Sequence, residues 1–146
     1  MRAWRTVLAP AASVLAALTL AACGEPSSRE TFIRSDGSGE YSFPVAMPDS
    51  TAAYDILFYT VVDKVPMAPD TLASFPMLVT WKSPSGRYFS ETVYYPVALH
   101  RVLYRSGIVP AEAGDWSLSV SVAPEPEGLR GLGLIVKTIK TEQYGE

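Results

Sequence analysis

Beyond residue 40, apolar and polar residues alternate with a period of two along most of the chain. This alternation is typical of half-buried β-strands, because successive side chains of a strand point to opposite faces of the sheet. Segment 116–122 shows the pattern most cleanly. Its apolar residues, which alternate with three serines, are Trp116, Leu118, Val120 and Val122. We predict that these four side chains face the core and that the serines face water.

Five other segments carry a strand signal, and they are 41–46, 54–62, 75–81, 87–95 and 132–139. The first contains Pro44, which has no N–H to donate and therefore suits an edge strand. The second is rich in β-branched and aromatic residues, which favours a central strand. Residues 83–86, Ser-Pro-Ser-Gly, predict a hairpin turn. Residues 63–73, with two prolines and two aspartates, predict a loop.

Residues 97–105 do not follow the period of two. The spacing of Val97, Leu99, Val102 and Leu103 permits one or two helical turns, and Pro96 could begin such a segment. We interpret this stretch as an irregular or short helical crossover.

The fold class follows from the number and spacing of these segments. Six or seven strands with turns at fairly regular intervals predict an all-β protein. We expect a single antiparallel β-sandwich of about seven strands, Ig-like or jelly-roll-like, over residues 41–146. The chain lacks the strand–helix alternation of Rossmann folds and α/β barrels.

The first 22 residues have the composition of an export signal. Arg2 and Arg5 precede a stretch of apolar and small residues that is too short and too rich in alanine for a transmembrane span. Leu20, Ala21 and Ala22 then precede Cys23, as in the lipobox of bacterial lipoproteins. The sequence predicts cleavage before Cys23 and lipidation of its thiol. An ordinary cleaved signal and a retained signal anchor are the alternatives.

Two or three acyl chains at Cys23 would anchor the protein stably in a membrane, since each buried methylene contributes about 0.8 kcal/mol. Gly24 stands where an inner-membrane retention signal has aspartate, so we expect the outer membrane. Residues 23–40 contain Gly, Pro, Ser and charged residues and predict a flexible tether. Within this tether, Phe32 and Ile33 could form a short first strand.

Removal of the signal takes away two arginines and no acidic residue, so the formal charge of −3 becomes about −5. A mildly acidic domain is a poor match for nucleic acid. Cys23 is the sole cysteine of the sequence, so no disulfide can form within the chain.

The candidate chemistry is sparse, and we predict no catalytic residue, metal or cofactor. His100 is the single histidine and is expected to be a surface or partly buried structural residue. The run Asp36–Glu40 has too few acidic residues for a calcium loop, so we expect a solvated linker. Residues 128–133 do not match a phosphate-binding glycine motif and predict a turn into the last strand.

Aromatic residues near the 83–86 turn are the best candidates for a binding surface. Trp81 and Tyr88 flank the turn, and exposed rings there could stack as a platform for a glycan or a peptide. Tyr94 and Tyr95 belong to the same group. Strand alternation predicts that about half of these four rings point inward, and core packing is the favoured interpretation.

The last part of the chain resembles the gliding-motility lipoprotein H family of Bacteroidetes. The resemblance rests on residues 114–116 (Gly-Asp-Trp), residues 129–137 (Leu-Arg-Gly-Leu-Gly-Leu-Ile-Val-Lys) and residues 54–56 (Tyr-Asp-Ile). It covers residues 41–138. It implies an outer-membrane accessory lipoprotein of a gliding or secretion machine, and it supplies no catalytic residues.

Three functions remain open from the sequence. The first is a non-enzymatic lipoprotein that docks on envelope proteins, which predicts an exposed apolar or aromatic patch. The second is a surface module for a glycan or a peptide, which requires exposed Trp81 and Tyr88. The third is an envelope hydrolase, which requires His100 beside an acidic residue.

Overall fold

The computed structural model describes residues 28–63, 74–96 and 100–139. Within these ranges every regular element is a strand, and no helix long and apolar enough to cross a membrane occurs. The strands are β1 (Ser28–Arg34), β2 (Glu40–Met47), β3 (Ala53–Val62), β4 (Phe75–Lys82), β5 (Tyr88–Tyr95), β6 (Arg101–Ile108), β7 (Gly114–Ser121) and β8 (Leu129–Ile139).

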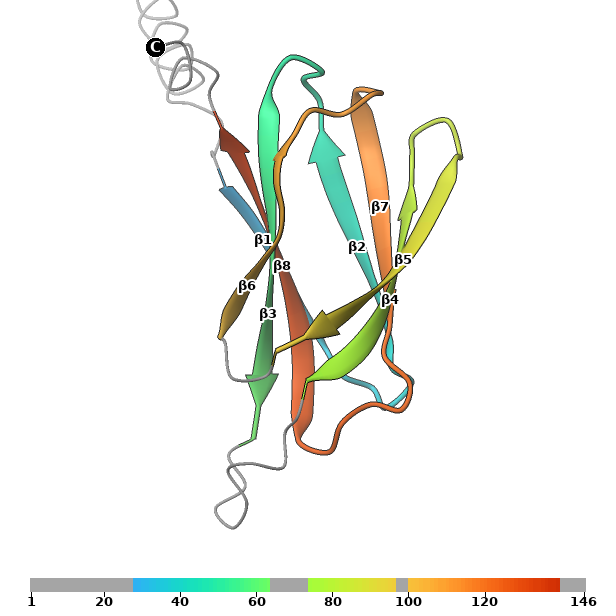
Figure 1. The fold of residues 1–146 in the computed structure, drawn as a ribbon, viewed down its shortest axis with the longest axis vertical. Helices are drawn as coiled ribbons and strands as arrows, with labels where there is room; N and C mark the ends of the chain where they lie inside the picture. Colours follow the sequence, from blue (N-terminus) through green and yellow to red (C-terminus); the bar gives the residue numbers. More distant parts are fainter. Residues whose placement is uncertain (1–27, 64–73, 97–99, 140–146) are drawn as a thin grey trace, which may run out of the picture.

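The eight strands form two four-stranded antiparallel sheets that pack face to face (Figure 1). Sheet A has the order β1-β8-β3-β6, and sheet B has the order β2-β7-β4-β5. The pairs β1–β8, β2–β7, β3–β6 and β4–β5 are nested in the chain, which is the connectivity of a jelly roll. The predicted antiparallel β-sandwich is therefore confirmed, with eight strands where about seven were expected.

The strands predicted from alternation are found at their expected places. In β7 and just beyond it, Leu118, Val120 and Val122 are fully buried, and Trp116 packs against the core with part of its surface exposed. β2 carries Pro44 and lies at the edge of sheet B, whereas β3 lies between β8 and β6. The 83–86 turn joins β4 to β5, with Gly86 N–H donating to the Ser83 carbonyl at 3.0 Å.

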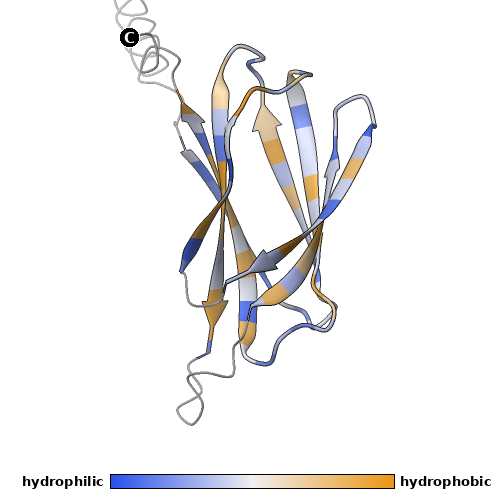
Figure 2. Cartoon of the chain, viewed as in Figure 1, coloured by the Kyte–Doolittle hydropathy of each residue, from blue (hydrophilic) through white to orange (hydrophobic). Residues whose placement is uncertain are grey.

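The core lies between the two sheets and is built from large side chains of both. Figure 2 shows hydrophobic bands alternating with hydrophilic ones along strands such as β2 and β4. The largest fully buried side chains include Phe43 and Met77 from sheet B and Tyr54, Phe58 and Leu134 from sheet A.

The segment 23–40, expected to be a tether, contains a strand, as the alternative of a short first strand at Phe32 and Ile33 allowed. Residues 28–34 form β1, which pairs with β8 over seven residues from Ser28–Lys137 to Arg34–Gly131. Phe32 stacks on Tyr59 of β3 with ring centroids 6.0 Å apart. β1 is rich in polar residues because it is an edge strand, so its composition is that of a linker although its backbone belongs to the sheet.

The expected crossover over residues 97–105 is wrong where the structure describes it. Residues 101–108 form β6, which pairs with β3. The register shifts twice between Tyr54 and Leu57, and this irregularity breaks the period of two. Residues 97–99 lie outside the described residues, as do the signal segment 1–22, the lipobox residues Leu20, Ala21 and Ala22, Cys23, and residues 64–73 of the predicted loop.

Candidate functional site

The structure separates the four aromatic residues that the sequence grouped as a binding surface. Tyr88 is 69% exposed and Tyr94 is 67% exposed, whereas Trp81 is 5% exposed and Tyr95 is 1% exposed. The expectation that half of the rings point inward is confirmed. A platform of stacked Trp81 and Tyr88 is wrong, because the two side chains lie on opposite faces of sheet B.

The register of the β4–β5 hairpin explains this outcome. Tyr88 is opposite Lys82, and the Lys82 ammonium lies 5.6 Å from the Tyr88 ring centroid on the outer face. Trp81 is opposite Phe89 instead, so these two side chains share the inner face. Phe89 is nevertheless 56% exposed, because it lies at the free side of β5.

A cleft of about 270 Å³ opens beside Phe89, between the ends of the two sheets. The indole rings of Trp81 and Trp116 line it and meet edge to face, with centroids 6.1 Å apart. The β6–β7 loop contributes Val109, which is 59% exposed, and the other lining residues are Met47, Arg105, Ile108, Pro110 and Ala111. The cleft is therefore apolar and aromatic, with Arg105 as its charged lining residue.

A side-chain network ties the two sheets together beside this cleft. The Trp81 indole N–H donates to the Tyr104 hydroxyl at 3.0 Å, and the two rings stack with an interplanar angle of 13°. The Tyr104 hydroxyl donates in turn to the Glu91 carboxylate, which also accepts a hydrogen bond from Arg105. The Arg105 guanidinium lies 4.9 Å from the Tyr104 ring centroid. The network fixes the position of Trp81 under the cleft.

The electrostatics of the network keep Tyr104 neutral. Burial of the phenol, together with its hydrogen bond to the Glu91 carboxylate, raises the pKa of Tyr104 to about 12. The neutral hydroxyl can therefore accept from Trp81 and donate to Glu91 at the same time.

The polar groups of the cleft already have partners inside the protein. The Trp81 N–H is bonded to Tyr104, and the Trp116 N–H donates to the Glu112 carbonyl at 2.9 Å. Arg105 is paired with Glu91. What the cleft offers to a ligand is mainly apolar surface, with the guanidinium of Arg105 as its charged side chain, and this suits an aliphatic or aromatic group.

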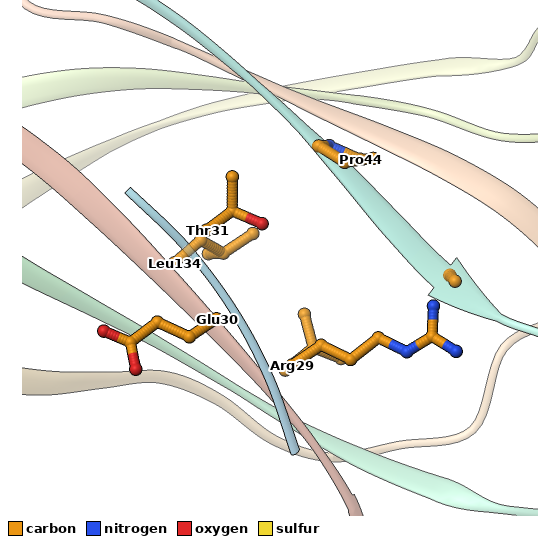
Figure 3. A pocket seen from close by; sticks show the side chains of 7 residues that line it. Arg29, Glu30, Thr31, Pro44 and Leu134 are labelled. Atoms are coloured by element: carbon orange, nitrogen blue, oxygen red, sulfur yellow. The ribbon is translucent and has the colours of Figure 1, made fainter. Parts of the chain in front are cut away.

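A second hollow, of about 380 Å³, lies on the other side of the sandwich between β1 and β2. Leu134 and Pro44 line it, and Figure 3 shows the Arg29 side chain extending towards the end of β2 while Glu30 points away. It is larger than the cleft, but no aromatic ring lines it. We therefore take the cleft beside Phe89 as the candidate functional site.

The remaining sequence candidates make contacts within the fold. His100 is exposed, and its ring lies 6.4 Å from the Tyr59 ring, measured between centroids. Its backbone carbonyl accepts a hydrogen bond from the Tyr95 hydroxyl at 3.3 Å. Asp36 closes the β1–β2 turn by accepting from the Ser38 N–H at 2.9 Å. Gly128 has a φ of 89° in the turn before β8, as predicted. In the described part of the chain, no three His, Cys, Asp or Glu residues gather as metal ligands.

Sequence reasoning missed Phe89, Val109 and the Tyr104–Glu91–Arg105 network. Counting outward from a turn at 83–86 pairs Trp81 with residue 88, so the sequence did not point to Phe89. In the structure five residues, 83–87, separate the paired ends of the hairpin, and this shifts the partner of Trp81 to Phe89. The network had no signal in the sequence either, since its members lie on two strands of different sheets.

No family model matches the chain, and no curated protein matches it. Among solved structures, the chain is similar to TmCBM61 in its complex with beta-1,4-galactotriose. The two have 16% sequence identity and a TM-score of 0.38, over 77% of this chain and 88% of the other.

Proposed function

We propose that the chain is a non-enzymatic lipoprotein of the outer membrane that binds another protein of the cell envelope. Its role in this proposal is that of an accessory component of gliding-motility or secretion machinery. The lipobox that ends at Cys23 supports the anchor, and the resemblance to the gliding-motility lipoprotein H family supports the role.

The observation that carries the docking proposal is the apolar cleft beside Phe89. Phe89 and Val109 each expose more than half of their surface at its rim, and the buried Trp81 forms its floor. Aromatic side chains in such positions are typical of protein–protein interfaces, where they bury a large area at small entropic cost. An apolar side chain of a partner would complete the packing around Phe89.

A glycan is a poorer match for this cleft. A sugar-binding site supplies several polar groups to the hydroxyls of its ligand, whereas both indole N–H groups are already bonded within the protein. Among the side chains that line the cleft, this leaves the guanidinium of Arg105, which also pairs with Glu91, as the polar group for a sugar. A partner protein that contributes an apolar residue leaves the internal hydrogen bonds intact.

The docking proposal is tested by photo-crosslinking in the living bacterium. A benzophenone amino acid replaces Phe89 in one strain and Tyr88 in a second strain. The two positions are adjacent on β5 and each is more than half exposed, but they lie on opposite faces of sheet B. We expect a discrete protein adduct from position 89 and none of that mass from position 88. Equal adducts from both positions, or none from position 89, would contradict the proposal.

The anchor is tested separately, by growth on radiolabelled palmitate. We expect label on the mature protein and its recovery in the outer-membrane fraction, and Cys23→Ser should abolish both. An unlabelled wild-type protein in the periplasmic fluid would overturn the anchor without bearing on the cleft.

A further inference from the structure

Each sheet of the sandwich ends in two strands that have a neighbour on one side within the described residues. Three of these four edges carry features that disfavour pairing with another chain. β1 has three charged residues among its seven, and β2 has Pro44 at its middle. β6 pairs irregularly with β3 and contains Gly107 at a φ of 66°.

The fourth edge, β5, has none of these features. Its eight residues pair with β4 in continuous register from Tyr88–Lys82 to Tyr95–Phe75. It contains no Pro, Gly or Lys, and most of its residues are aromatic or β-branched, which favours an extended backbone. Its single charged residue is Glu91, whose carboxylate points inward to Tyr104 and Arg105.

We propose that an extended segment of the partner protein adds to the free edge of β5 as a further strand of sheet B. The inference rests on the proposed docking function and specifies its geometry. Hydrogen bonds between the two backbones would supply affinity, and alternate side chains of the added strand would supply specificity.

The hollows beside β5 define which side chains the added strand needs. The inward-facing positions of β5 are Phe89, Glu91, Val93 and Tyr95, and Tyr95 is already buried in the core. The cleft of about 270 Å³ lies beside Phe89, and a smaller hollow of about 70 Å³ lies beside Val93, where Phe58 and Val102 contribute apolar surface. The added strand therefore carries a large apolar residue opposite Phe89 and a small apolar residue opposite Val93, four positions apart.

The residue between these two faces Glu91. An acidic residue there would face a carboxylate directly across the strand pair, and such like-charge pairs are unfavourable. The partner segment consequently has a neutral or basic residue at its middle inward position.

Repulsion between like charges also disfavours a second copy of this chain as the occupant. Two β5 strands that pair antiparallel can bring an apolar residue to both hollows only with Phe89 of each copy opposite Val93 of the other, and the smaller side chain then meets the larger cleft. That register places the two Glu91 residues opposite each other. Charge complementarity thus favours a different chain, whose middle residue is not acidic.

The test uses the full mature chain and a displayed library of random dodecapeptides as the probe. We expect selected peptides to share two apolar residues four positions apart with no acidic residue midway. Their binding should slow amide hydrogen exchange in β5 selectively. Two versions of a selected peptide are then made, one methylated on its odd-numbered backbone nitrogens and one on its even-numbered backbone nitrogens. Only every second N–H of an added strand points to β5, so one version should lose binding and the other should keep it.

Two variants serve as a matched pair. Phe89→Ala should weaken peptide binding about tenfold or more, whereas Tyr88→Ala should leave it within about twofold. Glu91→Gln should admit peptides with a midway acidic residue. The proposal is overturned if exchange slows on β1 or β6 and not on β5, if both methylated peptides still bind, or if purified protein self-associates through β5.

These outcomes are separable from failure of the docking function. A site-dependent adduct from position 89 in cells, together with no protection of β5 by any peptide, would retain docking and reject strand addition. No adduct from position 89 would reject the docking function itself.

Discussion

The Trp81 indole N–H donates to the Tyr104 hydroxyl across 3.0 Å, and their rings stack with centroids 6.3 Å apart. Trp81 belongs to β4 of sheet B, and Tyr104 belongs to β6 of sheet A. The pair therefore joins the two sheets at the side of the sandwich where the cleft opens. Because Tyr104 also donates to Glu91, one phenol connects β4, β5 and β6.

Tyr104→Phe should destabilise the protein although the ring is retained. The variant leaves the Trp81 N–H without its acceptor in a largely buried place, and we expect the free energy of unfolding to fall by about 1–3 kcal/mol. Urea denaturation followed by tryptophan fluorescence measures the change. Tyr94→Phe is the control. Because Tyr94 is exposed, the free energy of unfolding of this variant should stay within about 0.5 kcal/mol of the wild-type value. Equal effects would contradict the role of the Tyr104 hydroxyl.

The stability of the protein should decline in strongly alkaline solution. Burial, together with hydrogen bonds to Glu91 and Glu125 respectively, raises the pKa values of Tyr104 and Tyr41 to about 12, above the usual value of about 10. The unfolded chain loses these protons first, so this contribution is complete below pH 10 and is lost as the pH rises to about 12. Urea midpoints measured between pH 9 and about 12 should fall, and less steeply in Tyr104→Phe. An identical slope in that variant would contradict the assignment.

Gly39→Ala should be much more damaging than Gly37→Ala in the same turn. Both glycines have positive φ values, 76° and 86°, so each substitution carries backbone strain of about 1–2 kcal/mol. A Cβ at Gly39 would lie 2.1 Å from the Val122 carbonyl oxygen, whereas a Cβ at Gly37 would meet nothing within 4 Å. We expect Gly39→Ala to cost about 1–3 kcal/mol more than Gly37→Ala in thermal unfolding. Similar costs would show that the contact with Val122 is unimportant.

Gly133→Ala should be coupled to Tyr59. The Tyr59 ring lies over Gly133, and an added Cβ would come within 2.1 Å of its carbons. The methyl group must displace the ring from its stack on Phe32, at a cost of about 1–3 kcal/mol. Combining the substitution with Tyr59→Ala should cost less than the sum of the two single changes, because the clash disappears. Additive free energies of unfolding would contradict the contact.

Much of the fold could be predicted from the sequence where one face of a strand is buried and the other is exposed to solvent. The serines of β7 identified that strand and its exposed face, and the proline of β2 identified an edge strand. β1 could not be recognised in this way, because an edge strand needs little apolar surface and its pairing with β8 comes from a segment a hundred residues away. β6 was missed because its register shifts interrupt the alternation.

The candidate site was harder to predict than the fold. The sequence named Trp81 as a possible half of an exposed platform, with core packing as the favoured interpretation, and the structure buries it beside the cleft. Its ring is covered by Tyr104 and Trp116, which come from strands of both sheets. Contacts of this kind depend on how the sheets are superposed, and local residue patterns carry no information about that superposition.

β1 begins at Ser28, five residues after the proposed lipid-bearing Cys23. A chain of five residues spans at most about 17 Å when fully extended, so the start of β1 would stay close to the lipid headgroups. Strand pairing puts the end of β8, the start of β3 and the end of β6 at this same end of the sandwich, and the cleft-lining loop after Ile108 follows from it. An anchored molecule would present its cleft almost at the bilayer surface, within reach of proteins embedded in that bilayer or attached to it.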